Sequence, residues 1–159
     1  MKRDAALVGR APSPAPDPLV RRPLIRRGEP PDLPEIAAIQ AASPEASSWP
    51  PADYLQYDLR VAVVEDRVAA FLAARAAAGD EFEILNLAVA TEFRRLGVGR
   101  ALLESFLAGL RGAVFLEVRR SNSTAREFYK SLGFKELTLR EDYYSLPPEA
   151  AIVMKFHSC

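Results

Sequence analysis

The sequence predicts a single-domain α/β fold with a mixed central sheet. The chain has 159 residues, enough for one domain with a substantial core. Its apolar runs suggest strands first, then strand, helix, strand and helix, and finally two strands, a succession typical of a mixed sheet. Within the strand at 82–89 the apolar positions change from even (Phe82, Ile84) to odd (Leu85, Leu87, Val89). This change of parity indicates a β-bulge in the central strand.

The N-terminal residues 1–18 are expected to form a flexible, proline-rich extension, and residues 19–157 the domain. Prolines alternate with other residues at 12, 14, 16 and 18, and the segment has too little apolar surface to order itself. Leu19–Arg26 is predicted to be the first strand. A helix should follow, with Asp32 as its N-cap and with Ile36, Ile39 and Ala42 on one face.

The middle and end of the chain supply further strands. Leu59–Val64 and Val68–Ala76 are predicted to form a hairpin, and Ala77–Asp80 a turn into the central strand. Before the hairpin, a proline-broken loop carries the only tryptophan, Trp49. The last predicted strands are Lys135–Leu139 and Ala151–Phe156, separated by a long loop or arm at 140–148.

Two helices alternate with a strand after residue 89. Apolar residues at 102, 103, 106, 107 and 110 predict a helix over about 97–110, which Gly112 should end. Ala113–Val118 is predicted to be a strand buried on both faces. A second helix should run over about 123–132, ended by Gly133, with Ser121, Asn122 and Ser123 as N-cap candidates and Thr124 with Glu127 as a capping box.

The composition excludes several classes of function. The 21 basic and 21 acidic residues balance, so there is no general electrostatic case for binding nucleic acid. No apolar run reaches membrane-spanning length and no signal-peptide core is visible, so we expect no membrane partner. One cysteine, Cys159, fits a reducing cytoplasm. With one histidine, His157, a zinc site with two histidine ligands is impossible, and proton chemistry should fall to carboxylates, tyrosine or water.

The segment 94–100 has the composition of a phosphate-binding loop. Two glycines at a helix start allow close approach to a ligand, and Arg94, Arg95 and Arg100 add the charge that a diphosphate requires. A P-loop is absent. A dinucleotide fingerprint fits poorly, because Leu102 takes the third glycine position, although Glu117 has the spacing of a ribose-binding acid. A pyrophosphate loop for coenzyme A, or a helix start without a ligand, remains.

Further residues resolve this choice. They are Leu87-Ala88-Val89, Arg94-x-x-Gly97-x-Gly99-Arg100-Ala101-Leu102-Leu103, Leu116-Glu117-Val118-Arg119, Ser121-Asn122, Ala125, Tyr129, Leu132-Gly133-Phe134, Arg140-x-x-Tyr143-Tyr144 and Ala151-Ile152-Val153-Met154. From about Ile25 to Phe156 the chain resembles the GNAT superfamily of N-acetyltransferases, and more closely the bacterial ribosomal-protein-alanine N-acetyltransferases. The resemblance implies a GNAT fold of about seven strands and about four helices, acetyl-CoA as cosubstrate, and no metal.

The resemblance also assigns roles to residues. Glu117 would be the general base, and Tyr129 would protonate the coenzyme A thiolate. The coenzyme would be bound by backbone groups of the bulged strand, by the glycine loop and by an asparagine: Leu87, Ala88, Val89, Arg94, Arg95, Leu96, Gly97, Val98, Gly99, Arg100 and Asn122. Simpler structural roles are an ion pair of Glu117 with Arg119 or Arg126, and packing of Tyr129 beside Phe128 and Leu132.

The resemblance implies that the acceptor is the N-terminal α-amine of a protein or peptide, with a ribosomal protein as partner. Tyr143 and Tyr144 would hold the peptide backbone, and Trp49 would either line the same groove or anchor its loop. A single carboxylate serves an α-amine of pKa near 8 more readily than a lysine near 10.4. The alternatives are an acetyltransferase acting on small molecules or lysine, and a non-catalytic module that binds acetyl-CoA.

Overall fold

Seven strands form one mixed sheet, and only one pair of neighbours in it runs parallel. The computed structural model describes residues 22–46, 48–145 and 147–158; the expected extension 1–18, the beginning of the first expected strand and Cys159 lie outside them. The strands are β1 (Leu24–Arg27), β2 (Asp58–Val64), β3 (Arg67–Ala76), β4 (Glu81–Val89), β5 (Gly112–Arg119), β6 (Lys135–Ser145) and β7 (Pro148–Ser158). Their order is β1-β2-β3-β4-β5-β7-β6, with β4 and β5 as the parallel pair.

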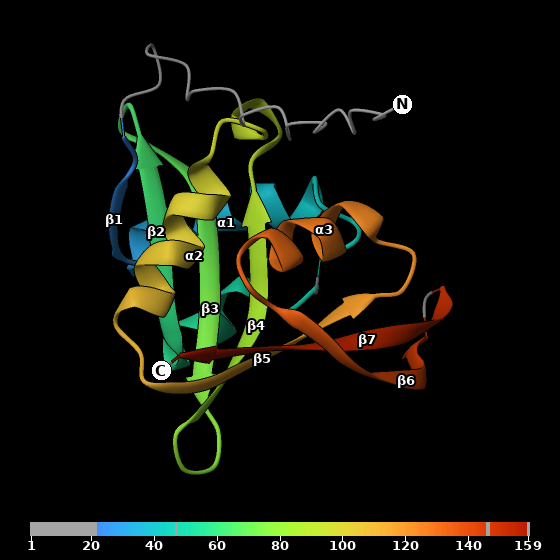
Figure 1. Cartoon of the computed structure of the whole chain (residues 1–159). Coiled ribbons are helices and arrows are strands. Elements are labelled where there is room, and N and C mark those ends of the chain that lie inside the picture. The colour runs from blue at the N-terminus through green and yellow to red at the C-terminus, as the bar shows by residue number, and fades with distance from the viewer. Residues whose placement is uncertain (1–21, 47, 146, 159) are drawn as a thin grey trace, which may run out of the picture.

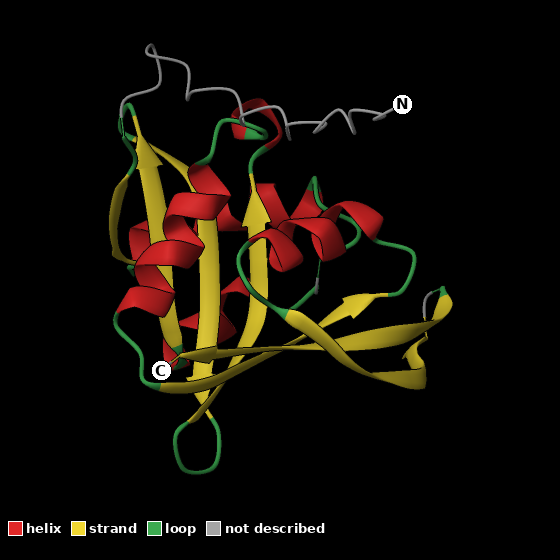
Figure 2. Cartoon of the chain, viewed as in Figure 1, coloured by secondary structure: helices red, strands yellow, loops and turns green. Residues whose placement is uncertain are grey.

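Helices cover both faces of this sheet. They are α1 (Leu33–Ala41), α2 (Val98–Ala108) and α3 (Ser123–Ser131), with short 3-10 helices η1 (Pro30–Asp32), η2 (Pro51–Gln56) and η3 (Thr91–Phe93). α1 lies behind the sheet, and α2 and α3 lie in front of it (Figures 1 and 2). Each face has its own apolar cluster. Among the described residues, none of the helices has the length and apolarity needed to span a bilayer.

The predicted bulge in β4 is confirmed. Ala73 of β3 pairs with Asn86 whereas Ala74 pairs with Ile84, so Leu85 is an extra residue. Before the bulge Ile84 packs on the α2 face, and after it Leu87 packs on that face too, three positions later. The bulge therefore moves the odd positions of β4 from one face of the sheet to the other.

β4 and β5 stop pairing just before the bulge. Their parallel pairing covers only Glu81–Glu83 with Ala113–Phe115, although both strands continue well beyond these residues. In Figure 1, β5, β7 and β6 run across the direction of β1–β4. The sheet therefore opens between the C-terminal ends of β4 and β5, which lead into α2 and α3 respectively.

The helix α2 fits the predicted spacing, but its end was predicted wrongly. Leu102, Leu103 and Phe106 are fully buried, while the helix stops at Ala108. Gly112, which was expected to end it, is instead the first residue of β5 and has φ +119°. Glycine is required at position 112 by a contact with a distant segment, because a Cβ there would lie 2.0 Å from the Asp80 carbonyl oxygen.

We therefore expect Gly112→Ala to lower the free energy of unfolding by about 2 kcal/mol or more, because it combines a strained backbone with a backbone clash. Gly79→Ala is the matched control. Gly79 also has positive φ (+61°), but a Cβ there would meet nothing within 4 Å, so we expect a cost of only about 1 kcal/mol. Urea unfolding measures both. Equal losses would show that the Asp80 contact is unimportant.

The two hairpins differ in how well they were predicted. Glu65 and Asp66, both at positive φ, form the tight turn of β2 and β3, which confirms the first hairpin. The predicted loop or arm at 140–148 is wrong, because β6 continues to Ser145 and β7 begins at Pro148. Its polar residues lie on an exposed edge strand with an irregular register between Arg140 and Tyr144, so they lack the apolar alternation that predicts a strand.

Candidate active site

A cavity of about 750 Å³ occupies the opening between β4 and β5. Its lining residues come from β4 and β5, from the start of α2, from α3, from the loop after α1 and from β6. They include most of the predicted site: Leu87, Ala88, Val89, Arg94, Arg95, Gly97, Val98, Gly99, Arg100, Glu117, Asn122, Tyr129 and Tyr144. Leu96, Trp49 and Tyr143 are not part of this lining. Leu96 packs on the core beneath α2.

The loop before α2 has the backbone conformation of an anion-binding site. Arg95 (φ +61°) and Gly97 (φ +81°) are both left-handed, separated by one residue. Such alternation turns successive N–H groups toward one side, and the start of α2 adds its unpaired N–H groups and positive dipole end. Gly99 has a different purpose, since a Cβ there would lie 3.0 Å from Val89 Cγ2. A small residue at 99 lets α2 pack closely on β4.

Charge at the loop gives a sharp test with an isosteric control. We expect Gly97→Asp to weaken acetyl-CoA binding by about 2 kcal/mol, because a carboxylate would face the diphosphate at a site of charge-assisted hydrogen bonds. Gly97→Asn has the same shape without the charge, and asparagine tolerates the left-handed conformation. A Cβ at 97 meets nothing within 4 Å, so neither variant has a steric clash there. Calorimetric titration with acetyl-CoA compares these two variants with wild type and with Arg95→Glu. Equal acetyl-CoA affinities for Gly97→Asp and Gly97→Asn would contradict the assignment of this loop to the diphosphate.

Arg94 makes contacts that differ from its expected role in charge neutralisation. Its Nε donates to the Val89 carbonyl oxygen (3.1 Å), and its Nη2 donates to the Ala42 carbonyl oxygen (3.3 Å) and to Ser43 Oγ (3.1 Å). The guanidinium thus connects the end of β4 to the loop after α1. The sequence analysis named Trp49 of this loop as a possible groove residue, whereas the part of the loop that lines the cavity is Ser43–Ala46.

Tyr129 lies on α3 at the cavity and is only 8 % exposed. Its ring makes edge contacts with Phe128 and Phe134, and burial, followed by the nearby Tyr144, raises the pKa of its phenol above the usual value. The phenol therefore stays protonated throughout the neutral range. It is available as a donor rather than as a base.

The start of α3 differs from the predicted capping box. Asn122 is the N-cap, and its Oδ1 accepts a hydrogen bond from the Ala125 N–H (3.1 Å). Its amide oxygen is thus used within the helix start, while the residue, which was expected to bind the coenzyme, lines the cavity. Thr124 and Glu127 do not provide the cap.

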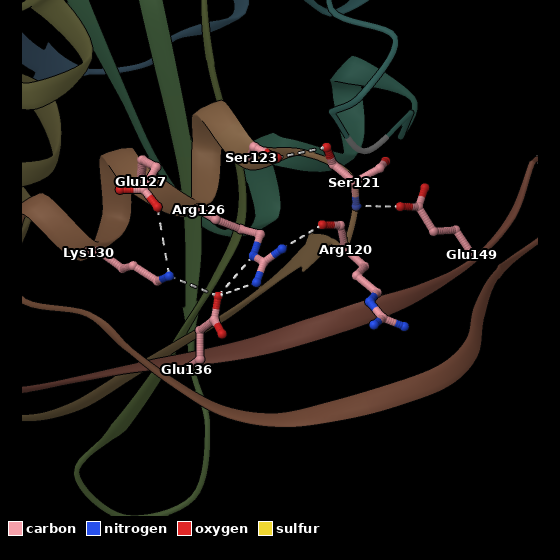
Figure 3. Close-up of polar contacts among 8 residues, drawn as sticks. All are labelled: Arg120, Ser121, Ser123, Arg126, Glu127, Lys130, Glu136 and Glu149. Carbon is pink, nitrogen blue, oxygen red and sulfur yellow. Dashed lines mark hydrogen bonds and ion pairs between the residues drawn. The ribbon is translucent and has the colours of Figure 1, made fainter.

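A polar network fixes α3 to the outer strands (Figure 3). Arg126 donates to the Arg120 carbonyl oxygen (2.8 Å) and pairs with Glu136 of β6 (2.7 Å), which Lys130 also approaches at 3.3 Å. These cations hold the pKa of the Glu136 carboxyl below its usual value. Glu149 of β7 accepts from the Ser121 N–H. The helix that bears Tyr129 is therefore held in place from the side opposite the cavity.

Glu117 pairs with neither of the two arginines expected for a purely structural role. Arg126 pairs with Glu136, and Arg119 lies 3.5 Å from Glu149. Glu117 instead accepts from Arg140 Nη1. A hydrogen bond to Glu117 is also the main reason why the pKa of Tyr143 is raised to about 12. Tyr143 and Arg140 thus face the predicted base from β6.

The remaining aromatic candidates divide between the cavity and the core. Tyr144 lines the cavity, and its ring lies 4.1 Å from the Arg119 guanidinium carbon. Trp49 stacks on the fully buried Tyr54 at 6.1 Å and makes an edge contact with Tyr57. Of its two expected roles, these contacts match the one that anchors the loop.

Two side chains near the reacting region were missed from the sequence. Asn86, next to the bulge, is buried and donates to the Tyr54 hydroxyl (2.9 Å), which donates to Gln40 Oε1 (2.6 Å). A lone amide in an apolar strand was a readable signal of such a network. Arg140 belonged to a motif, but nothing in the sequence indicated its carboxylate partner.

The arrangement has the parts needed for transfer to an amine. A carboxylate and a protonated phenol line one cavity, together with a loop whose backbone has the conformation of an anion-binding site. A carboxylate can accept a proton from an ammonium group, and a phenol can donate to a developing anion. Among the described residues, no group of three or more His, Cys, Asp or Glu side chains is arranged to hold a metal ion.

Comparison with known proteins points in the same direction. Residues 56–136, just over half of the chain, match the family described as "Acetyltransferase (GNAT) domain". Over 96 residues the chain is 45% identical to the ribosomal protein bS18-alanine N-acetyltransferase of Salmonella typhimurium, covering 57% of this chain. The matched part spans 64% of that relative's length and 55% of the corresponding Escherichia coli protein.

Solved structures extend the similarity to most of the chain. The crystal structure of the ribosomal-protein-S18-alanine N-acetyltransferase from Escherichia coli is 31% identical, with a TM-score of 0.72, and the match covers 86% of this chain and 96% of that one. Chaetomium thermophilum Naa20 in complex with a bisubstrate analogue is 28% identical, with a TM-score of 0.74, covering 83% and 85%. These values confirm the predicted fold class.

Proposed function

The chain belongs to the acetyltransferase (GNAT) family, and from this premise we propose that it transfers an acetyl group from acetyl-CoA to the N-terminal α-amine of a protein. The observation that carries the proposal is the placement of Glu117 and Tyr129 along one cavity that begins at the anion-binding loop. Glu117 lies on β5 and Tyr129 on α3, so the two groups approach the cavity from different elements. A base and a hydrogen-bond donor on different elements suit a reaction in which the amine loses a proton and the leaving sulfur needs a donor.

The fit of acetyl-CoA rests on the shape and charge of the cavity. In the proposed complex the diphosphate lies on the N–H groups of the loop at 95–99, and the acetyl-bearing arm extends between β4 and β5. The cavity volume of about 750 Å³ is in the range of ligand sites. The N–H of Val89, just beyond the bulge, is the proposed donor to the oxyanion.

The proposed steps balance without an outside reagent. Glu117 takes a proton from the α-ammonium group, and the free amine attacks the thioester carbonyl to form a C–N bond. The attacking nitrogen then loses its second proton, the oxyanion collapses with cleavage of the C–S bond, and the leaving sulfur finally holds that second proton. Because burial raises the pKa of Tyr129, its phenol is a weaker acid than a thiol of pKa near 8.5. Its proposed contribution is therefore to donate a hydrogen bond that stabilises the negative charge on the leaving sulfur, without net loss of the phenolic proton.

The proposed acceptor is a protein N-terminus, with a ribosomal protein as the partner and the cytoplasm as the location. The names of the Salmonella and Escherichia coli relatives support this class of acceptor. Tyr144, which lines the cavity beside Arg119, is the proposed contact for the acceptor backbone.

An acceptor screen tests the proposal. Coenzyme A release is measured with peptides of varied N-terminal residue, with N-terminally blocked lysine peptides and with small amines. We expect alanine-initiated peptides to react fastest. A preference for blocked lysine peptides or for small amines would overturn the acceptor and keep the reaction, whereas coenzyme binding without any turnover would leave only a binding module.

A further inference from the structure

We propose that Arg140 occupies, in the ligand-free protein, the position on Glu117 that the acceptor's α-ammonium group must take. Arg140 is then a displaceable competitor that sets acceptor affinity. The inference rests on the proposed function, since it requires an ammonium group to approach Glu117.

The ion pair joins a well-exposed guanidinium to a largely buried carboxylate. Arg140 Nη1 lies 2.5 Å from Glu117 Oε1. The Glu117 side chain is 17 % exposed, whereas that of Arg140 is 55 % exposed. Glu117 lies near the end of β5, where its backbone pairs with Val153 of β7. Arg140 is on the edge strand β6, so it is the partner that can leave.

The strand order defines the path by which the Arg140 side chain reaches Glu117. Val153 pairs with Glu117 on one side and with Thr138 on the other, so Arg140 is two strands away from Glu117 and must extend across β7. Beyond Arg140 the register shifts, and Asp142 has φ +53°. This shift accompanies the placement of Tyr143 beneath the guanidinium, with the Arg140 carbon 4.6 Å from the ring centre.

The other arginines near Glu117 pair with other carboxylates, so Arg140 is the cation that would compete with the acceptor for Glu117. Arg119 and Arg126 have carboxylate partners of their own in Glu149 and Glu136. Glu83, which pairs with Arg75 at 2.7 Å, also attracts the Arg140 guanidinium. When Arg140 leaves Glu117, the Tyr143 ring, 4.6 Å from the guanidinium carbon, remains as a contact for it. Displacement therefore requires movement of an exposed side chain.

Competition has a signature that a structural role lacks. An acceptor peptide with a free α-amine must displace Arg140, whereas the same peptide already acetylated at its N-terminus has no ammonium group and need not. Removing the guanidinium should therefore strengthen binding of the first peptide only. Because one partner of the pair is well exposed, the gain should be modest, about threefold in Kd.

The experiment uses the full chain saturated with coenzyme A, which lacks the acetyl group and so prevents turnover. Calorimetry measures Kd for an alanine-initiated peptide and for its N-acetylated form with wild type, Arg140→Met and the control Arg120→Met. Arg120 is an exposed arginine on the turn before α3. We expect Arg140→Met to bind the free peptide about threefold more tightly, and both variants to bind the acetylated peptide as wild type does.

A double-mutant cycle with Glu117→Gln completes the test. In that background Arg140→Met should produce no further gain, because the charge for which the two cations compete has gone. Weaker binding of both peptides by Arg140→Met, or a gain that persists in Glu117→Gln, would overturn the inference. Failure of wild type to acetylate any peptide would instead overturn the proposed function. Unchanged Kd values in an active enzyme would overturn this inference alone.

Discussion

Tyr129→Phe is expected to reduce turnover by about 100-fold or more while leaving acetyl-CoA affinity within about twofold of wild type. The substitution removes the hydroxyl and keeps the ring, whose contacts with Phe128 and Phe134 hold it in the core. The leaving thiolate then lacks its donor, but the loop that binds the diphosphate is untouched. Steady-state rates and calorimetric titration separate the two effects.

The pH dependence of this residue has a definite sign. Burial raises the pKa of the Tyr129 phenol, and the protonated phenol is the active form. Activity should therefore not fall through loss of this proton as the pH rises from 7 to 9. A tyrosine that only fills the core would allow Tyr129→Phe to work at nearly the wild-type rate, and that result would remove it from the mechanism. Unchanged thermal unfolding of the variant is the control for folding.

Glu117→Gln is expected to slow acetylation of an alanine-initiated peptide by about 100-fold near pH 7 and by clearly less near pH 9. At pH 7 most of an α-amine with pKa near 8 is protonated and needs a base, whereas at pH 9 most of it is already neutral. The deficit of the variant should therefore shrink as the pH rises. Rates of both proteins between pH 6.5 and about 9.5 measure this, with the range set by the α-amino pKa.

A peptide blocked at its N-terminus but carrying a lysine is the matched control. Only about one lysine in twenty-five is neutral at pH 9, so the variant should recover little with this acceptor. Glu117→Gln also removes the carboxylate that pairs with Arg140. The double variant with Arg140→Met, assayed alongside, should show the same pH dependence. A Glu117→Gln enzyme as fast as wild type at pH 7 would show that another group takes the proton.

The sequence predicted those parts of the site whose cause is local. The glycine loop could be recognised because left-handed residues and a helix start require particular residue types close together in the chain. The bulge was visible because a strand with one buried face cannot change parity without an extra residue. The register at Leu85 confirms the bulge, and Gly97 has the positive φ that the glycine loop requires.

Contacts between distant segments were harder to predict. Nothing in the sequence near Arg94 shows that its guanidinium bonds the loop after α1, some fifty positions earlier. Gly112 was wrongly assigned as the end of α2 for the same reason, because the contact that leaves no room for a Cβ there is with Asp80 in a neighbouring turn. Each of these errors concerns a residue whose conformation depends on a segment elsewhere in the chain.

By itself, the sequence therefore determined the order of elements, the bulged strand and the glycine loop, and it predicted the residue types of the base and donor, because periodicity, turn chemistry and motif spacing operate over a few residues. Only the tertiary structure decided that β4 and β5 part after Phe115 to open a cavity, and that Glu117 pairs with Arg140 instead of Arg119 or Arg126. Those outcomes depend on strand order and register, which place β7 between β5 and β6. A side chain two strands away can then reach the base, at a separation along the chain that no local pattern encodes.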